Sequence, residues 1–304
     1  MYLRAALTSF RRGGSSLPTD VISQSDVAVD VEHLAAYNRV CGFGLRDELP
    51  ATYPHVLAFP LQMRLMTSAG FPFPLPGLVH IGNRITVARP VLASSRFSLQ
   101  VRAVDLRPHE RGRQFDVVSE LLVDSAVVWT DVSTYLRREG SSGSSGSGSS
   151  DVPAPSAVWS VPADIGRRYA DVSGDRNPIH LNAFAARLFG FRRSIAHGMW
   201  TKARSLAALE GRLPSAYTVD VRFKLPVLLP AKVGFSASAV GDGWEFAVHD
   251  IRSGRPHLAG TVAAFTAAST LVQSNGAPPD SRLSTGSELS TGAPLSRSTR
   301  HPRE

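Results

Sequence analysis

The sequence has little cysteine, few acidic side chains relative to basic ones, and no long apolar run. Its one cysteine, Cys41, excludes a disulfide within the chain and favours a reducing compartment. No apolar stretch approaches the roughly 20 residues of a transmembrane helix, so we expect no membrane span. With 33 basic and 25 acidic residues the formal net charge is +8, which favours an anionic partner.

The basic residues are dispersed, with only short pairs such as Arg11-Arg12 and Arg137-Arg138. A phosphate-bearing small ligand suits this pattern as well as a nucleic acid does, and we expect no nucleic-acid partner. The opening residues 1–16 contain three arginines and no acid, as organelle transit peptides do. A frayed basic terminus has the same composition, so we expect a cytoplasmic protein, with an organelle as the alternative.

Composition divides the chain into two halves of similar size. Residues 140–150 read GSSGSSGSGSS, which has nothing to bury and is typical of a flexible linker. From about residue 272 the chain is rich in Ser, Thr, Gly, Pro and Arg, which predicts disorder. The predicted organisation is a first repeat (1–139), a linker (140–152), a second repeat (153–271) and a disordered tail (272–304).

Each half predicts helices first and strands second, an α+β arrangement. Helical patterns cover 31–43 and 61–70 in the first half, and 162–174, 182–191 and 198–211 in the second. Runs that are rich in Val and Phe, in which apolar and polar residues alternate, are separated by Pro and Gly. They predict strands over 80–92, 96–106, 114–124, 126–136, 217–230, 232–240, 243–251 and 257–267.

The halves also share residues, which indicates an old duplication packed as a pseudo-dimer. RPVL at 89–92 matches LPVL at 225–228, residues 37–43 match 169–175, and residues 58–60 match 196–198. On this alignment the first half has Phe43, Glu48 and Pro60 where the second half has Asp175, His180 and Gly198. We therefore expect chemistry in the second half only.

Asp175 and His180 stand five residues apart across an Asn-Pro turn, so both can reach one water molecule. A neutral imidazole beside a carboxylate suits general acid–base work near neutral pH. Asn177 offers an amide that can satisfy the loop backbone or orient a neighbour. With His197 the pair could also ligate a metal, but no cysteine or further carboxylate joins at a familiar spacing, so we expect no metal.

Gly198 is placed at the start of a predicted helix. Free N–H groups and the positive end of the helix dipole stabilise an oxygen that gains negative charge, and glycine lets a ligand approach closely. His197, just before it, suits a structural or hydrogen-bonding role better than a catalytic one. Met199 and Trp200 suit the core.

These residues resemble a known family. Tyr169, Ser173-Gly174-Asp175, Asn177-Pro178-Ile179-His180 and Ala186 resemble the hydratase 2 motif of the MaoC-like (R)-specific enoyl-CoA hydratases, and the segment ending IAHGM resembles the family's next segment. The resemblance implies a double hot-dog fold, in which an antiparallel sheet wraps a central helix in each repeat. It also implies reversible hydration of trans-2-enoyl thioesters to (R)-3-hydroxyacyl thioesters in fatty acid metabolism.

The resemblance assigns roles to numbered residues. Asp175 and His180 activate the water, Gly198 supplies the oxyanion N–H, and Asn177 orients. His197, Met199, Arg192 and Arg193 become candidate substrate-binding residues. Lys202 and Arg204 also lie near the motif, and each of these basic residues is more often plain surface. A sterile first repeat beside an active one is similar to family members that accept long acyl chains.

The expected partner is an acyl thioester of coenzyme A or of acyl carrier protein, with no cofactor besides coenzyme A as part of the substrate. A homodimer is a further expectation, since a sheet edge often remains exposed after one pseudo-dimer forms. The alternatives are a hot-dog thioesterase and a non-catalytic acyl-thioester-binding subunit.

Overall fold

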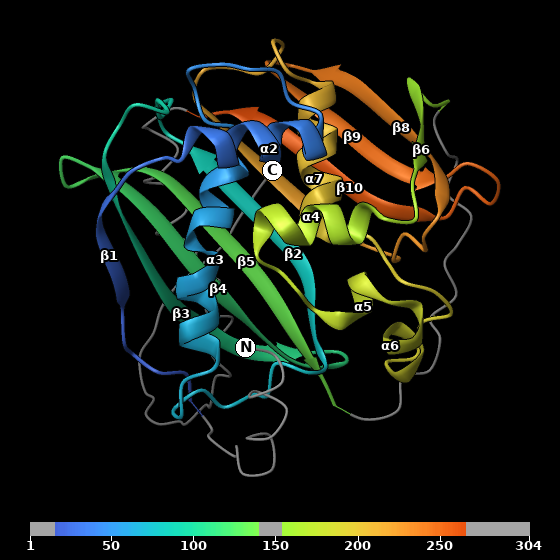
Figure 1. The fold of residues 1–304 in the computed structure, drawn as a ribbon, viewed down its shortest axis with the longest axis horizontal. Coiled ribbons are helices and arrows are strands. Elements are labelled where there is room, and N and C mark those ends of the chain that lie inside the picture. Colours follow the sequence, from blue (N-terminus) through green and yellow to red (C-terminus); the bar gives the residue numbers. More distant parts are fainter. Residues whose placement is uncertain (1–15, 140–153, 266–304) are drawn as a thin grey trace, which may run out of the picture. The chain divides into compact units, whose positions relative to one another are not determined.

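A single antiparallel sheet runs through both halves of the chain in the computed structural model, which describes residues 16–139 and 154–265 (Figure 1). Its strand order is β1-β3-β4-β5-β2-β7-β10-β9-β8-β6. The first half contributes β1 (Ile22–Val27), α2 (Val31–Cys41), α3 (Tyr53–Met66), β2 (Leu78–Val87), β3 (Phe97–His109), β4 (Gly112–Val123) and β5 (Ala126–Arg138). The second half contributes β6 (Ala157–Val161), α4 (Ile165–Ser173), α5 (Pro178–Leu181), α6 (Ala183–Leu188), α7 (Gly198–Ala208), β7 (Tyr217–Phe223), β8 (Ala231–Val240), β9 (Gly243–Asp250) and β10 (Pro256–Ala264).

The strand order reads the same from either end, because each half places its elements in the same sequence. The halves join where β2 pairs with β7 in the middle of the sheet. At that seam Arg84 lies opposite Asp220, and the two side chains form an ion pair at 2.7 Å. The linker predicted at 140–152 and the tail predicted at 272–304 lie outside the described residues.

Both halves carry a helix whose end is fixed by a left-handed glycine. Asp30 is the N-cap of α2, and its carboxylate accepts the N–H groups of Glu32 (2.9 Å) and His33 (3.1 Å). The C-cap of α2 is Gly42, with φ at 85°, and the C-cap of α4 is Gly174, with φ at 72°. Glycine reaches this conformation without the Cβ clash that other residues suffer.

The central helices α3 and α7 lie against the sheet and carry much of the core. α3 is longer than the helix predicted over 61–70, because it already begins at Tyr53 and runs through Pro60. Most of its residues are buried, so apolar and polar residues do not alternate with the helical period, and the sequence gives no signal of where this helix starts. The edge strands β1 and β6 were also not predicted, because they are short and largely polar or exposed.

Backbone hydrogen bonds show which residues of the two halves are structurally equivalent. The N–H of Leu49 donates to the carbonyl of Val91 (2.8 Å), and the N–H of Ala196 donates to the carbonyl of Val227 (3.0 Å). Val91 and Val227 hold the same place in RPVL and LPVL. Leu49 is therefore the counterpart of Ala196.

This register corrects the match between Pro60 and Gly198. Gly198 follows Ala196 by two residues, so its counterpart is Ala51, and Pro60 lies well inside α3. The alignment by similar residues failed because it did not take into account which strand each segment pairs with. A missing backbone donor at Pro60 is thus not what separates the two halves.

The match between Glu48 and His180 is wrong as well. Glu48 forms an isolated bridge with Leu92, and Ile195 forms the equivalent bridge with Leu228. Glu48 is therefore the counterpart of Ile195. Within the described residues 16–139, the loop after α2 contains nothing equivalent to α5 and α6, and so no position that corresponds to His180.

Among the described residues, no helix is both long and apolar enough to cross a bilayer.

Candidate active site

The motif residues lie where the ends of α4, α5 and α7 meet. Asp175 directly follows Gly174, and its backbone N–H donates to Ser173 Oγ (3.2 Å). His180 lies on the single turn of α5, which begins with Pro178. Asn177 caps that turn, with its side-chain oxygen accepting the N–H of Ile179 (3.4 Å). The predicted Asn-Pro turn is therefore a short capped helix.

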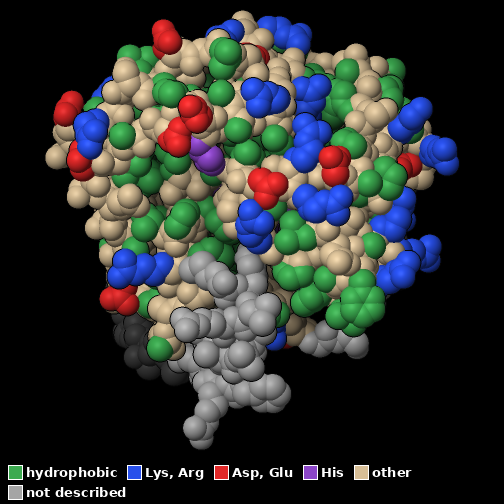
Figure 2. Space-filling view, viewed as in Figure 1, with side chains coloured by type: hydrophobic (Ala, Val, Ile, Leu, Met, Phe, Trp, Pro, Cys, Tyr) green, Lys and Arg blue, Asp and Glu red, His purple; other side chains and the backbone are tan. Residues whose placement is uncertain are grey.

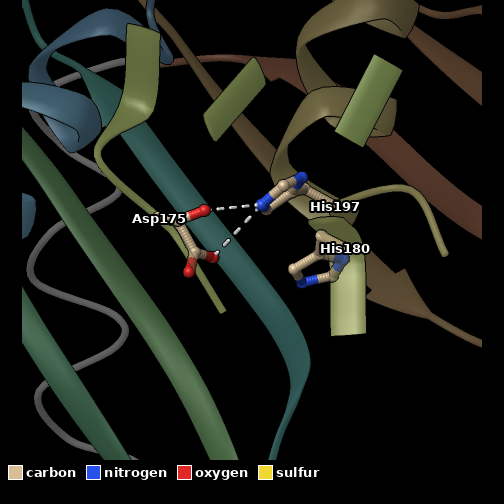
Figure 3. Close-up of side chains that lie close together, drawn as sticks. All are labelled: Asp175, His180 and His197. Carbon is tan, nitrogen blue, oxygen red and sulfur yellow. Dashed lines mark hydrogen bonds and ion pairs between the residues drawn. The ribbon is translucent and has the colours of Figure 1, made fainter. Parts of the chain in front are cut away.

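Three side chains from this region gather at one point (Figure 3). A carboxylate oxygen of Asp175 and one ring nitrogen each from His180 and His197 lie within 4.8 Å of one another. The two imidazoles stack with their centroids 3.6 Å apart. His197 is buried, whereas Asp175 and His180 are half-buried and so lie closer to solvent.

Carbonyl partners fix which nitrogen of each histidine carries a proton. His180 Nδ1 lies 2.8 Å from the carbonyl oxygen of Ile195, and His197 Nε2 lies 3.0 Å from that of Asp175. A carbonyl oxygen only accepts hydrogen bonds, so both of these nitrogens must donate. This leaves the other nitrogen, Nε2 of His180 and Nδ1 of His197, as an acceptor.

Burial keeps both histidines neutral. It lowers the pKa of His180, against opposing effects from the Asp175 carboxylate and the Ile195 carbonyl. For His197, burial and the neighbouring His180 together lower the pKa to about 3, against opposing effects from the carboxylate and the carbonyl of Asp175. His180 therefore presents a neutral, basic Nε2, and the nearby carboxylate favours the imidazolium that forms when this nitrogen takes a proton.

Gly198 is the first residue of α7, with His197 as its N-cap. The N–H groups of a first helical turn have no intrahelical acceptor, so this turn can donate to an anionic oxygen. A Cβ at Gly198 would lie 2.9 Å from the ring of Phe223, so only glycine fits here without movement of that ring.

Gly166 on α4 is a site residue that the sequence reading missed. A Cβ there would lie 2.1 Å from the carbonyl oxygen of His180, so the missing side chain allows α4 and α5 to touch. The signal was a glycine inside an amphipathic helical pattern, where it is unfavourable unless close packing requires it.

The remaining sequence candidates are spread over different environments. Met199 is buried in the core. Arg192 and Arg193 are exposed on the loop before α7, where Arg193 donates to the carbonyl of Pro230 (3.4 Å). Arg204 lies over the ring of Trp159 at 5.1 Å. Lys202, expected at the surface, is fully buried, because its ammonium finds backbone and side-chain oxygens inside the protein.

The first half also contributes to the surroundings of the site. The ring of His80 on β2 lies 5.0 Å from that of Phe223 and 4.7 Å from that of Tyr135. Burial lowers the pKa of His80 to about 3. No sequence signal pointed to His80, because the pairing of β2 with β5 and β7 brings it to Tyr135 and Phe223.

Asp175, His180 and His197 are also the described residues that could together hold a metal ion. Metal binding needs a deprotonated ring nitrogen. Nε2 of His197 donates to the Asp175 carbonyl, so only Nδ1 of this ring is deprotonated and could serve as a ligand.

Comparison with known proteins places this fold and site in a family. The family model described as MaoC like domain matches residues 151–259, which contain the whole motif. The 3-hydroxyacyl-thioester dehydratase X of Mycobacterium tuberculosis is 40% identical over 252 residues, covering 81% of this chain and 90% of that protein. The chain belongs to the MaoC-like dehydratase family.

A solved structure and a further relative agree with this membership. The crystal structure of HtdX from M. tuberculosis superposes on this MaoC-like protein with a TM-score of 0.74 at 39% identity, covering 81% of this chain and all of that chain. A 3-hydroxybutyryl-CoA dehydratase of Methylorubrum extorquens is 44% identical over 68 residues, covering 22% of this chain and 42% of that protein. The predicted hot-dog fold is confirmed.

Proposed function

We propose that this MaoC-like enzyme adds water across the double bond of trans-2-enoyl thioesters to give (R)-3-hydroxyacyl thioesters, and catalyses the reverse dehydration, in fatty acid metabolism. The observation that carries the proposal is the meeting of Asp175, the basic Nε2 of His180 and the first turn of α7. The names of the relatives, which describe dehydratases of 3-hydroxyacyl and 3-hydroxybutyryl thioesters, support the same chemistry.

Hydration proceeds with a water molecule held between the Asp175 carboxylate and Nε2 of His180. As the water oxygen bonds to C3 of the substrate, the acid–base pair takes a proton from it. A proton is returned to C2, so the sum of the steps is the addition of one water molecule. The Asp175 carboxylate stabilises the imidazolium during the step.

The thioester carbonyl gains negative charge as C3 is attacked. An oxygen placed at the start of α7 accepts the N–H of Gly198, in the favourable field of the helix N-terminus. The ring of Phe223 occupies the space that a side chain at Gly198 would take, so glycine is required there for packing. Asn177 acts indirectly, because its cap holds the turn on which His180 lies.

The carrier of the acyl group is a coenzyme A or acyl carrier protein thioester. Arg187, Arg192 and Arg193 are exposed around α6, beside the site, and suit the phosphate groups of such a carrier. Hydrophobic side chains gather over α6, with basic side chains nearby (Figure 2). Phe184 and Leu188 on α6 are 70% and 73% exposed, which suits contact with a carrier more than with water alone.

The reaction proposed here uses neither a metal nor an organic cofactor, because one carboxylate, one imidazole and one backbone donor supply every proton and charge. Activity that survives treatment with EDTA supports this, and activity that requires added metal contradicts it. The preference for long acyl chains, the homodimer, the cytoplasmic location and the lack of a nucleic-acid partner stay predictions.

The experiment follows the loss of enoyl absorbance with crotonyl-CoA and with a long-chain trans-2-enoyl-CoA. We expect hydration of at least one substrate and an (R) product on chiral analysis. Release of free thiol without hydration would instead identify a thioesterase, and binding without turnover of CoA or carrier-protein substrates would identify a non-catalytic subunit. The ratio of the rates tests the preference for chain length.

A further inference from the structure

Lys202 lies one turn after Gly198 on α7 and is fully buried. Its ammonium donates to the carbonyl oxygens of Asn83 (3.1 Å) and Val219 (3.3 Å) and to the side-chain oxygen of Asn83. An ammonium has three N–H groups, and each of them has an oxygen here. The helix that carries Gly198 is thereby tied to β2 of the first half and to β7.

The contact continues into the first half through buried polar groups. The side-chain amide of Asn83 donates to a carboxylate oxygen of Asp131 and to Ser133 Oγ (3.0 Å). The other oxygen of Asp131 lies 2.5 Å from Nδ1 of His55. These side chains are buried, and they connect α7 with β2, β5 and α3. We refer to Lys202, Asn83, Asp131 and His55 as the seam network.

Stability alone gives little reason for the seam network. A buried pair of opposite charges is often no more stable than apolar residues that fill the same space. The network is also asymmetric: in the register set by Leu49 and Ala196, His55 is the counterpart of Lys202. The two halves thus bring different groups to one shared cluster, and only one of these groups lies on the helix of the active site.

We propose that Lys202 is a positioning residue, which acts through Asn83 and Asp131 to hold α7, and with it the N–H of Gly198, in place against the first half. The inference rests on the proposed function. It gives the half without the motif a direct part in the reaction, as the template against which the oxyanion donor is set.

Protonation of Lys202 decides whether the seam network is complete. Burial lowers the pKa of Lys202 to about 7, while Asp131 on β5 and Asp220 on β7 act to raise it. His55 on α3 and His80 on β2 also lie in this cluster. Below this pKa the ammonium has three donors, and above it the amine has two. We therefore expect kcat to fall as the pH rises through the neutral range.

The test compares Lys202→Met with the double variant Lys202→Met/Asp131→Asn, and uses Lys232→Met as the control because Lys232 is exposed on β8. The single variant removes the buried ammonium that interacts electrostatically with the Asp131 carboxylate and leaves the Asn83 oxygens without their donor, so it should lose thermal stability. The double variant removes both charges and should regain most of it. In both variants we expect kcat to fall by about 10- to 100-fold with KM changed by less than about threefold, because the donor is misplaced.

Recovery of kcat together with stability in the double variant would overturn the proposal, since the network would then be merely structural. So would a wild-type kcat that stays constant from pH 6 to 9, a measurement that does not depend on any variant folding. In variants that fold, the alkaline fall of kcat should be absent. Lack of turnover by the wild type would contradict the proposed function itself and is thus a separate result.

Discussion

Replacing Gly166 with alanine tests whether close packing of α4 on α5 places the catalytic base. The new Cβ would lie 2.1 Å from the carbonyl oxygen of His180 and 3.0 Å from its carbon, whereas ordinary contacts begin at 3.4 Å. Both atoms belong to the backbone, so no side chain can rotate away. The turn that carries His180 must therefore move.

The size of the displacement sets the expected effect. Restoring an ordinary contact requires movement of about 1 Å, and misplacement by this amount costs on the order of 100-fold in rate. Alanine favours a helix more than glycine by about 1 kcal/mol, so it offsets part of the loss of stability caused by the clash. We expect kcat for enoyl-CoA hydration to fall far more than thermal stability does.

The matched control is Gly70→Ala, because a Cβ at Gly70 meets no atom within 4 Å. This variant should keep the kcat of the wild type. A Gly166→Ala enzyme with wild-type kcat would refute the reasoning, because it would show that the position of α5 does not depend on its contact with α4.

Three further predictions concern the donor, the buried histidine and a helix cap. The first uses a Phe223→Ala background, which removes the ring that lies against Gly198; in it Gly198→Ala keeps the backbone N–H, whereas Gly198→Pro lacks it at a position where a helix tolerates proline. We expect kcat of the Pro variant to be about 100- to 1,000-fold lower than that of the Ala variant, and equal rates would contradict the role of the N–H. Burial lowers the pKa of His197 to about 3, so between this value and about 6.5 the unfolded chain binds a proton at this residue more readily than the folded protein does, and the free energy of unfolding should fall as the pH falls through this window. In urea unfolding, the free energy of unfolding of His197→Gln should depend less steeply on pH than that of the wild type, and an unchanged pH dependence would contradict a neutral His197 in the folded protein. Asp30→Ala removes the cap of α2 and should lower the free energy of unfolding by about 1 kcal/mol without changing kcat; unchanged stability in denaturant would show that the cap is not needed.

The sequence predicted the parts of the site that lie close together along the chain. Asp175, His180 and His197 meet because short capped helices connect them, and the caps themselves are visible as Gly174 and Asn177-Pro178. Strands were also predicted well where apolar residues alternate, as in β4 and β5. Local rules are sufficient for features of this kind.

Features that depend on contacts between distant segments were missed. Lys202 is basic and was expected at the surface, yet it is buried because Asn83 and Val219 supply oxygens from two other strands. The match of Pro60 with Gly198 failed because register is fixed by strand pairing, which similar letters do not reveal. The need for Gly166 likewise depends on a backbone atom of another helix.

The most direct test of the central claim is kcat for enoyl-CoA hydration in Asp175→Asn and His180→Ala, beside Asp171→Asn as a control. Asp171 lies on α4 and forms an exposed ion pair with Arg176, so its substitution alters a carboxylate close in sequence without touching the site. We predict that both site variants lose at least about 100-fold in kcat, as expected for removal of a general acid–base group, while the control keeps the wild-type rate. Wild-type turnover by folded Asp175→Asn or His180→Ala enzyme would contradict the claim that these two side chains activate the water.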